Sequence, residues 1–321
     1  MVIQPPKIGV VILNYNTAEE TLRCLRALRA ARGGERRVWV VDNGSTDGSQ
    51  ERIPGALAES EVFLETGANL GYAGGNNVGI REALRWGTDY VLLLNPDVEV
   101  EADFLPPLLR ALEASPRAGM ACPLVLQPDG ETVQSLGGDG SLWTGRFGRR
   151  LYGTPLARLQ EPRWAEVLFP HGACVLIRRR LFEETGLLAE PYFLYYEDVE
   201  FGLRARREGF STLAIPQSRV RHADSTKAGE RSPLVSYLGT RNAAWVVAQY
   251  GHPAQRLAFL FLSAYLRWPL RFLGRLLRGH FRAAGAVVRG AIHGQFRREW
   301  RAGGHLAVPW EGRRRVLEPL P

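Results

Sequence analysis

Residues 8–48 of the sequence read IGVVILNYNTAEETLRCLRALRAARGGERRVWVVDNGSTDG, in which one helical pattern separates two apolar runs. The runs Ile8–Leu13 and Val38–Asp42 are rich in Val, Ile and Leu with little alternation, which is typical of strands buried on both faces of a sheet. Two strands joined by one helix form a βαβ unit, and repeated units build a parallel sheet with helices on both faces. The segment therefore predicts an α/β fold.

The same alternation extends to about residue 115. Further strands are expected at Val62–Leu64 and Tyr90–Leu94, and helical patterns lie at Thr17–Ala31, Asp47–Leu57 and Asn76–Trp86. In open sheets of this kind, ligands bind beyond the carboxyl ends of the strands. That rule selects four loops as the candidate binding region, at residues 14–17, 43–49, 65–75 and 95–98.

The rest of the chain is less regular. Residues 116–165 contain many glycines and few periodic runs, so we expect a loop-rich region with short antiparallel strands. The later patterns predict strands at Val167–Ile177 and Ser211–Ile215, and helices at Arg178–Thr185 and Asp198–Glu208. From Pro233 to about Trp300 the pattern is helical, and a loose tail is expected over residues 301–321.

Composition limits the class of protein. Of 321 residues, 45% are hydrophobic and 23% are charged, which favours a soluble globular protein and excludes a collagen or a small disulfide scaffold. Cys24, Cys122 and Cys174 are far apart, so a cysteine zinc cluster is not expected and a reducing compartment is favoured. The N-terminus lacks a signal-peptide pattern, and Leu257–Leu266, the longest apolar uncharged run, is too short to cross a bilayer.

Two common nucleotide-binding motifs are missing. The junction Leu13–Thr17 contains no glycine, so it lacks the GxGxxG fingerprint of a dehydrogenase, and GxxxxGK[ST] is found nowhere in the chain. The second strand instead ends in Asp42, which can accept a hydrogen bond from a base N–H or a ribose hydroxyl. The alternative is that VDNGSTDG, residues 41–48, is only a tight turn followed by a helix cap.

Six segments occur in order over residues 8–222: ILNYN, VVDNGSTDGS, NLGYAGGNNVGI, LLLNPDVEV, HGACVLIRR and YFLYYEDVEFGLRARREG. Together they resemble glycosyltransferase family 2 and, within it, the rhamnosyltransferase-like enzymes. The resemblance implies a GT-A fold over residues 1–232, with a nucleotide-binding half at about 1–115 and an acceptor half at about 116–232. A basic amphipathic segment (233–300) and the tail follow. It also implies a nucleoside-diphosphate-sugar donor (dTDP or UDP), a divalent metal, and inversion at the anomeric carbon.

A metal site is expected after the fourth strand, at Asn95-Pro96-Asp97. A divalent cation held by a carboxylate and by phosphate oxygens neutralises the departing diphosphate. Members of the family often have Asp-x-Asp here, so Asn95 leaves Asp97 as the one carboxylate of the triplet. By the same resemblance His222 is the second ligand, and one Asp with one His suits Mn²⁺ or Mg²⁺. The alternatives are a strand-to-turn sequence without a ligand and a structural histidine.

The catalytic base is expected at the start of a helix. Inversion in a single displacement needs one carboxylate to take the proton of the acceptor hydroxyl. Matching YYEDVEFGLR to the family's "ED" motif makes Asp198 the base, with Glu197 orienting the acceptor, beside aromatic residues on which a sugar ring can stack. The alternative is an acidic N-terminus favoured by the helix dipole, next to ordinary core aromatics.

Donor contacts are expected at the loops that follow the strands. Gly74 lets backbone approach a ligand, and a helix N-terminus favours anionic groups. The alternative is a glycine-rich turn with asparagine caps. The expected nucleotide-sugar ligands are Asn14, Asn16, Asp42, Asn69, Gly74, Asn76, Asn95 and Asp97.

The C-terminal segment is strongly basic. Residues 251–321 contain thirteen arginines, no lysine and three acids. Six arginines fall on one side of a helical wheel, with apolar residues over most of the rest, and Pro269 is expected to kink or split the helix. Such a helix suits peripheral contact with anionic lipid through residues 257–289. The alternative is a helix packed on its own protein; nucleic acid is not expected, because no recognition motif accompanies the charge. The six are Arg267, Arg271, Arg275, Arg278, Arg282 and Arg289.

These patterns predict an inverting glycosyltransferase that moves rhamnose to a glycan or polyprenyl-linked acceptor in cell-surface polysaccharide synthesis. It is expected in the cytoplasm, at the inner face of the cell membrane. A non-catalytic binding module for a nucleotide sugar or glycan is the alternative. A nucleotidyltransferase is disfavoured, because Leu13–Thr17 contains neither the glycine nor the basic residue that a triphosphate loop requires.

Overall fold

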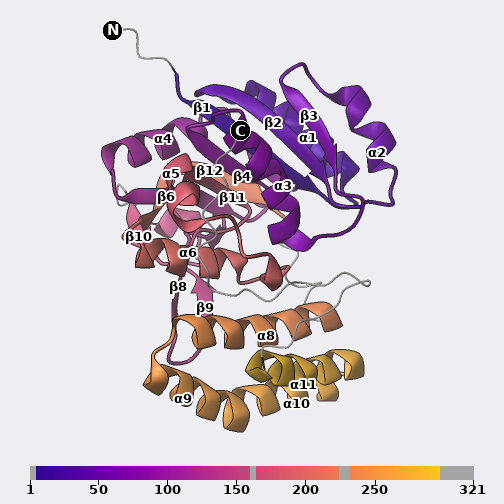
Figure 1. Ribbon diagram of the computed structural model, residues 1–321, viewed down its shortest axis with the longest axis vertical. Coiled ribbons are helices and arrows are strands. Elements are labelled where there is room, and N and C mark those ends of the chain that lie inside the picture. The colour runs from indigo at the N-terminus through magenta and orange to yellow at the C-terminus, as the bar shows by residue number, and fades with distance from the viewer. Residues whose placement is uncertain (1–4, 160–163, 224–231, 297–321) are drawn as a thin grey trace.

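The computed structural model describes residues 5–159, 164–223 and 232–296, and it confirms the α/β fold (Figure 1). The predicted tail and the last residues of the predicted helical segment lie outside these ranges. The strands of the main sheet are β1 (Lys7–Asn14), β2 (Glu35–Asp42), β3 (Glu61–Glu65), β4 (Tyr90–Leu94), β5 (Val98–Val100), β6 (Ala118–Leu126), β7 (Val133–Ser135), β10 (Ala165–Val167), β11 (Cys174–Arg178) and β12 (Ser211–His222).

The order of strands across the main sheet is β10-β12-β6-β11-β4-β1-β2-β3, with β5 paired to β12 and β7 to β6. Strands β4, β1, β2 and β3 are parallel, as the alternation of strands and helices predicts. Strand β11 runs antiparallel between β4 and β6. The carboxyl ends of β1, β2 and β4 therefore meet at one edge, where Asn14 lies opposite Asp42.

Helices cover both faces of the sheet and bury a separate apolar core on each. Helices α1 (Ala18–Ala30) and α4 (Leu105–Ala114) pack on one face. Helices α3 (Gly71–Arg85), α5 (Arg179–Thr185) and α6 (Glu197–Arg207) pack on the other. Gly79 lets α3 approach β1 closely, because a Cβ there would lie 2.5 Å from Cγ1 of Val11. This close packing fixes the N-terminus of α3 above the carboxyl end of β1.

Four sequence expectations about elements were wrong. Strand β6, nine consecutive buried residues inside the region expected to be loop-rich, is central to the sheet. The strand expected at Val167–Ile177 is divided between β10 and β11, since Pro170 and Gly172 interrupt it. Helix α3 begins at Gly71 rather than Asn76. The helix expected at Asp47–Leu57 is one turn, α2 (Ser49–Arg52), followed by a 3₁₀ turn, η1 (Pro54–Ala56), because Pro54 lacks the N–H that would continue it.

A layer of helices lies beside one end of this domain (Figure 1). Its elements are α8 (Pro233–Tyr250), α9 (Pro253–Leu262), the π-helical turn η4 (Ser263–Arg267), α10 (Trp268–Leu277) and α11 (Phe281–Phe296). A hairpin, β8 (Gly138–Ser141) and β9 (Arg146–Arg149), reaches from the domain to this layer, and Gly145 at its tip packs against Phe259 of α9. The remaining short elements are the 3₁₀ turns η2 (Leu156–Arg158) and η3 (Glu190–Tyr192).

The expectation of one continuous arginine stripe was wrong. The chain breaks at Gly279, whose φ is +75°, so Arg282 and Arg289 lie on a different helix from the other four. At Pro269, where a split was expected, the chain passes directly from η4 into α10. Within α9–α11, several large apolar side chains are exposed instead: Leu257, Phe261, Tyr265, Leu266, Leu270, Leu273, Leu277 and Phe281.

Candidate active site

The first two strands end in a buried polar network, in which the carboxylate of Asp42 is enclosed. Asp42 is completely buried, and its Oδ1 accepts a hydrogen bond of 2.7 Å from Nδ2 of Asn14. Its Oδ2 accepts from the backbone N of Ser45 at 3.1 Å and from Nε2 of Gln50 at 3.2 Å. Asn16 is exposed, with its backbone at a φ of +55°, and its Oδ1 accepts from the N of Thr46 at 2.7 Å. These bonds hold the loops after β1 and β2 together, and a direct donor contact by Asp42 stays a prediction.

The loop before α3 is fixed by asparagines. Oδ1 of Asn69 accepts a 2.8 Å hydrogen bond from the backbone N of Gly71, and Nδ2 of Asn43 donates to the same Oδ1 at 3.1 Å. Gly74 and Asn76, both predicted donor contacts, lie buried within the first turns of α3. Asn69 is exposed at the edge of the sheet, where a ligand can reach it.

The structure brings the two predicted metal ligands together. Asp97 precedes β5 and His222 ends β12, and antiparallel pairing of these strands sets His222 opposite Val98. Nε2 of His222 lies 3.2 Å from Oδ1 of Asp97. Nδ1 of His222 lies 2.8 Å from Oε1 of Gln134, which can accept only if Nδ1 carries the hydrogen. In the neutral tautomer with that hydrogen, the nitrogen facing Asp97 carries a lone pair and can bind a cation.

This pair fits a hard divalent cation. Two neighbouring ligands of an octahedral Mg²⁺ at about 2.1 Å are separated by about 3 Å, close to the separation of these two atoms. In that tautomer a lone pair of the carboxylate oxygen faces a lone pair of the imidazole nitrogen. A cation bound between them would offset their repulsion. Among the described residues, no group of three or more His, Cys, Asp or Glu side chains is placed to hold a metal. A bound ion would therefore take its other ligands from substrate and water.

The turn at residues 171–173 connects this pair to the predicted base. The ring of His171 lies 5.4 Å from that of His222, centroid to centroid. The carbonyl of Gly172 accepts a 2.6 Å hydrogen bond from the hydroxyl of Tyr72. A Cβ added to Gly172 would lie 3.8 Å from Oδ2 of Asp198, so the turn passes directly beside that carboxylate. Asp198, and Asp97 by way of His222, thus both lie near one short turn.

Glu197 and Asp198 begin α6, as predicted. Burial raises the pKa of Glu197 to about 8, and the neighbouring charge of Asp198 adds to the shift. Burial also raises the pKa of Asp198 to about 6, opposed by the backbone N–H of Val199, which donates to its Oδ1 at 2.8 Å. Oε2 of Glu197 is buried and has no hydrogen-bond partner among the described residues. Two neighbouring carboxyl groups with raised pKa values, one of which has an oxygen without a hydrogen-bond partner among the described residues, are typical of a site of proton transfer.

The segment before these acids is strained and is held by α8. Phe193, Tyr195 and Tyr196 all have φ between 65° and 72°, a region that costs a residue with a side chain about 1 kcal/mol or more. Nδ2 of Asn242, which is completely buried in α8, donates to the backbone oxygens of residues 192, 194 and 195 at 3.0, 3.0 and 2.7 Å. Arg241 beside it donates to the backbone oxygens of residues 191 and 192. The helical layer thus holds the backbone that leads into Glu197.

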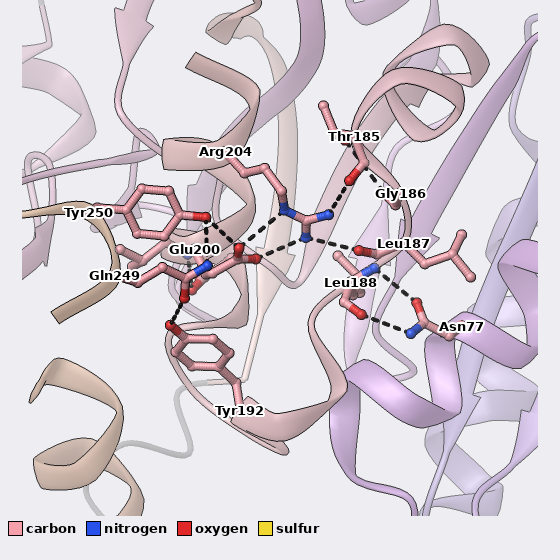
Figure 2. A network of polar contacts seen from close by, with 12 residues as sticks. Asn77, Thr185, Gly186, Leu187, Leu188, Tyr192, Glu200, Arg204, Gln249 and Tyr250 are labelled. Carbon is pink, nitrogen blue, oxygen red and sulfur yellow. Dashed lines mark hydrogen bonds and ion pairs between the residues drawn. The ribbon is translucent and has the colours of Figure 1, made fainter. Parts of the chain in front are cut away.

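A second network fixes α6 from both sides (Figure 2). Glu200, almost fully buried, pairs with Arg204 at 2.9 Å and accepts a 2.5 Å hydrogen bond from the hydroxyl of Tyr250 in α8. Arg204 also donates to the carbonyls of Thr185 and Leu187, at the end of α5 and just beyond it. Both carboxylate oxygens of Glu200 are taken up by Arg204 and Tyr250, so the role of Glu200 is structural.

Several of these residues escaped the sequence reasoning. Asn242 and Gln134 carry no motif, and only the structure shows that they orient the base and the histidine. Tyr72 was quoted within NLGYAGGNNVGI, but its position between Gly172 and the acids depends on tertiary packing. Glu200 lies two residues after Asp198 in the same motif. Its i,i+4 spacing to Arg204 is typical of a helical ion pair, and this spacing could have indicated a structural role for Glu200.

Comparison with known proteins gives concordant findings. The family model for glycosyl transferase family 2 matches residues 9–186. An N-acetylglucosaminyl-diphospho-decaprenol L-rhamnosyltransferase of Mycobacterium tuberculosis is 30% identical over 300 residues, which cover 88% of this chain and 94% of that protein. The low-salt glycan biosynthesis hexosyltransferase Agl10 of Haloferax volcanii is 32% identical over 241 residues, 73% of each chain.

A solved structure shares the fold. The structure of GalNAc-T7 with UDP, GalNAc and Mn²⁺ superposes on this chain with a TM-score of 0.64. The match covers 91% of this chain and 58% of GalNAc-T7. At 16% identity this likeness shows the GT-A fold alone. The predicted fold class is therefore confirmed.

Proposed function

Because the chain belongs to glycosyl transferase family 2 and is a glycosyltransferase, we propose that it moves rhamnose, with inversion, to a polyprenyl-linked glycan in cell-surface polysaccharide synthesis. The M. tuberculosis relative, matched over most of both chains, is named for this sugar and for a diphospho-decaprenol acceptor. The observation in the molecule that carries the proposal is the position of the Asp198 carboxylate. It lies beside the glycine turn whose neighbouring His171 packs near His222, the partner of Asp97.

The donor side of the site is assigned to Asp97 and His222. They would hold Mn²⁺ or Mg²⁺, which supplies positive charge to the leaving diphosphate when it is bound. The exposed loops after β1 and before α3, with Asn16 and Asn69, face the same edge and would contact the nucleotide. The sugar would then lie beside Gly172, where the absence of a side chain leaves room for it.

The acceptor side is assigned to Glu197 and Asp198. Asp198 takes the proton of the attacking hydroxyl, and the O–H bond breaks as oxygen joins the anomeric carbon opposite the departing diphosphate. Burial raises the pKa of both acids, and the charge of Asp198 raises that of Glu197 further, so the pair can keep one proton near neutral pH. With that proton on Glu197, this residue can donate a hydrogen bond to the acceptor while Asp198 accepts one.

The direct test of this function is transfer by the full chain. Labelled dTDP-rhamnose is incubated with a short-chain N-acetylglucosaminyl-diphospho-polyprenol, with Mn²⁺ or with EDTA. We expect label in the lipid product, with the anomeric configuration opposite to that of the donor, and a loss of at least about 100-fold in EDTA that Mn²⁺ restores. Tight donor binding without transfer to any acceptor across a broad panel would instead indicate a binding module.

We also propose that the helical layer contacts a membrane from its outer side. Large apolar side chains of α9, η4 and α10 are exposed, and Leu257, Tyr265 and Leu277 are each at least 70% exposed. No described residue of α9–α11 is acidic, so the face pairs exposed apolar groups with positive charge. This combination suits an interfacial helix against anionic lipid. None of the described helices has both the length and the apolar character to span a bilayer.

Vesicle binding tests the proposed membrane contact. The double variant Leu270→Asp/Leu277→Asp should reduce cosedimentation with phosphatidylglycerol vesicles at least about tenfold, because it places two charges in the apolar layer. Leu151→Asp, an exposed leucine of the catalytic domain, is the matched control and should bind as the wild type does. Equal binding by all three proteins would refute the assignment.

A further inference from the structure

Three arginines from two distant segments gather near Tyr196, two residues before the predicted base. At the hairpin tip, the carbonyl of Thr144 accepts a hydrogen bond from Arg267 of η4. Arg146 follows two residues later, and Arg271 lies one helical turn beyond Arg267. Phe147, the neighbour of Arg146, packs edge-on against Tyr196, with ring centroids 5.9 Å apart. Arg146, Arg267 and Arg271, the arginine cluster, therefore lie beside the residue that precedes Glu197.

In the part of the chain that the structure describes, the cluster has no counter-charge. Within residues 5–159, 164–223 and 232–296, no carboxylate forms an ion pair with any of the three guanidinium groups. Burial, followed by the charges of Arg271 and Arg146, lowers the pKa of Arg267. The charges of Arg271 and Arg267 also act on Tyr196, where they oppose the rise in its pKa that burial causes. Arginines brought together without an acid are typical of a phosphate-binding site.

An apolar groove adjoins the cluster. It has a volume of about 490 Å³, lies between α10 and α11, and is lined by Trp268, Phe272, Val287 and Ile292 among others. Trp268 and Phe272 each follow an arginine of the cluster directly in sequence, so the groove occupies the neighbouring strip of α10. A site with cations on one strip and hydrocarbon on the next matches an amphiphile with an anionic head.

We propose that the arginine cluster binds the diphosphate of a lipid-linked acceptor, and that the groove between α10 and α11 receives the first part of its hydrocarbon chain. The inference rests on the proposed function, since it identifies the acceptor subsite of the same reaction. A sugar attached to a diphosphate at this cluster would lie next to Tyr196 and so in front of Glu197 and Asp198. The donor diphosphate has a separate place at Asp97 and His222, across the Gly172 turn.

Binding of farnesyl diphosphate to the full chain tests the subsite without any turnover. Arg146→Gln and Arg271→Gln alter exposed side chains, so both variants should fold as the wild type does. We expect each to weaken farnesyl diphosphate binding about tenfold, since each removes a charge-assisted contact. Ile292→Gln should weaken farnesyl diphosphate and leave inorganic pyrophosphate unchanged. Arg278→Gln, an exposed arginine that bonds only to its own helix, is the matched control and should change neither.

The outcomes separate this proposal from its rivals. If the two variants bind farnesyl diphosphate like the wild type, the subsite does not exist. If they lose UDP or dTDP binding to the same extent, the arginines hold the donor. If the variants lose only their binding to phosphatidylglycerol vesicles, the arginines bind lipid headgroups. Either of these last two results overturns the assignment. Because binding requires no transfer, an enzyme that fails to transfer rhamnose but passes this test contradicts the proposed function and not the subsite.

Discussion

Asp198→Asn is expected to lower kcat/KM for transfer about 10³-fold while leaving donor binding unchanged, because it removes the one group placed to take the acceptor proton. The amide is nearly isosteric and can still accept the hydrogen bond from the N–H of Val199, so the start of α6 should keep its geometry. Steady-state transfer and nucleotide-induced thermal shifts measure the two effects. Asp103→Asn, an exposed carboxylate paired only with Arg32, is the control and should be fully active.

The pH dependence of transfer gives the same prediction a second readout. A base acts only when it is deprotonated, and burial raises the pKa of Asp198 to about 6. The kcat/KM of the wild type should therefore rise about tenfold per pH unit up to about pH 6 and level off above it. An acidic limb near pH 4, where an exposed aspartate titrates, would contradict a buried base with a raised pKa. Full activity in Asp198→Asn would show that Asp198 is not the base.

Asn242→Leu is expected to lower kcat about 10²-fold although this residue touches no substrate. Its side chain donates to three backbone oxygens of the strained segment before Glu197. Without these bonds, Tyr195 and Tyr196 should relax from positive φ and move the acids, and a displacement of about 1 Å is enough for such a loss. The melting temperature should also fall, because buried carbonyls lose their donor.

Two further measurements distinguish positioning by Asn242 from general destabilisation. The KM for the donor should not change, and the acidic limb of the pH profile should move to lower pH as Asp198 becomes more exposed. Thr240→Val, equally buried in the same helix, is the matched control because its hydroxyl bonds only to the carbonyl of Ser236 within that helix. If Asn242→Leu loses activity only in proportion to its folded fraction, the positioning role is refuted.

Local pattern predicted the strands of residues 1–115 well and those of residues 116–232 less well. Strands β1, β2 and β4 are buried on both faces, and their uniform Val, Ile and Leu content indicates this directly. Strand β6 is equally buried, but Gly119 and Pro123 interrupt its apolar run and concealed it. The break at Gly279 was missed because a helical wheel assumes a continuous helix.

The candidate site shows the same division between motif and context. Asp97, His222, Glu197 and Asp198 were selected by motif, and the structure gathers them around one turn. What the motifs could not supply is the support around them. The buried state of Asp42, the contact of Gln134 with His222 and the clamp by Asn242 all join segments far apart in the sequence. Such contacts arise only when the chain is folded.

The most direct test of the account is a crystal structure of the full chain with Mn²⁺ and an intact nucleotide sugar. The account predicts diphosphate oxygens at the cation held by Asp97 and His222, with the anomeric carbon between that diphosphate and the Asp198 carboxylate. An anomeric carbon whose open face points away from Asp198, or a diphosphate bound elsewhere, would contradict it.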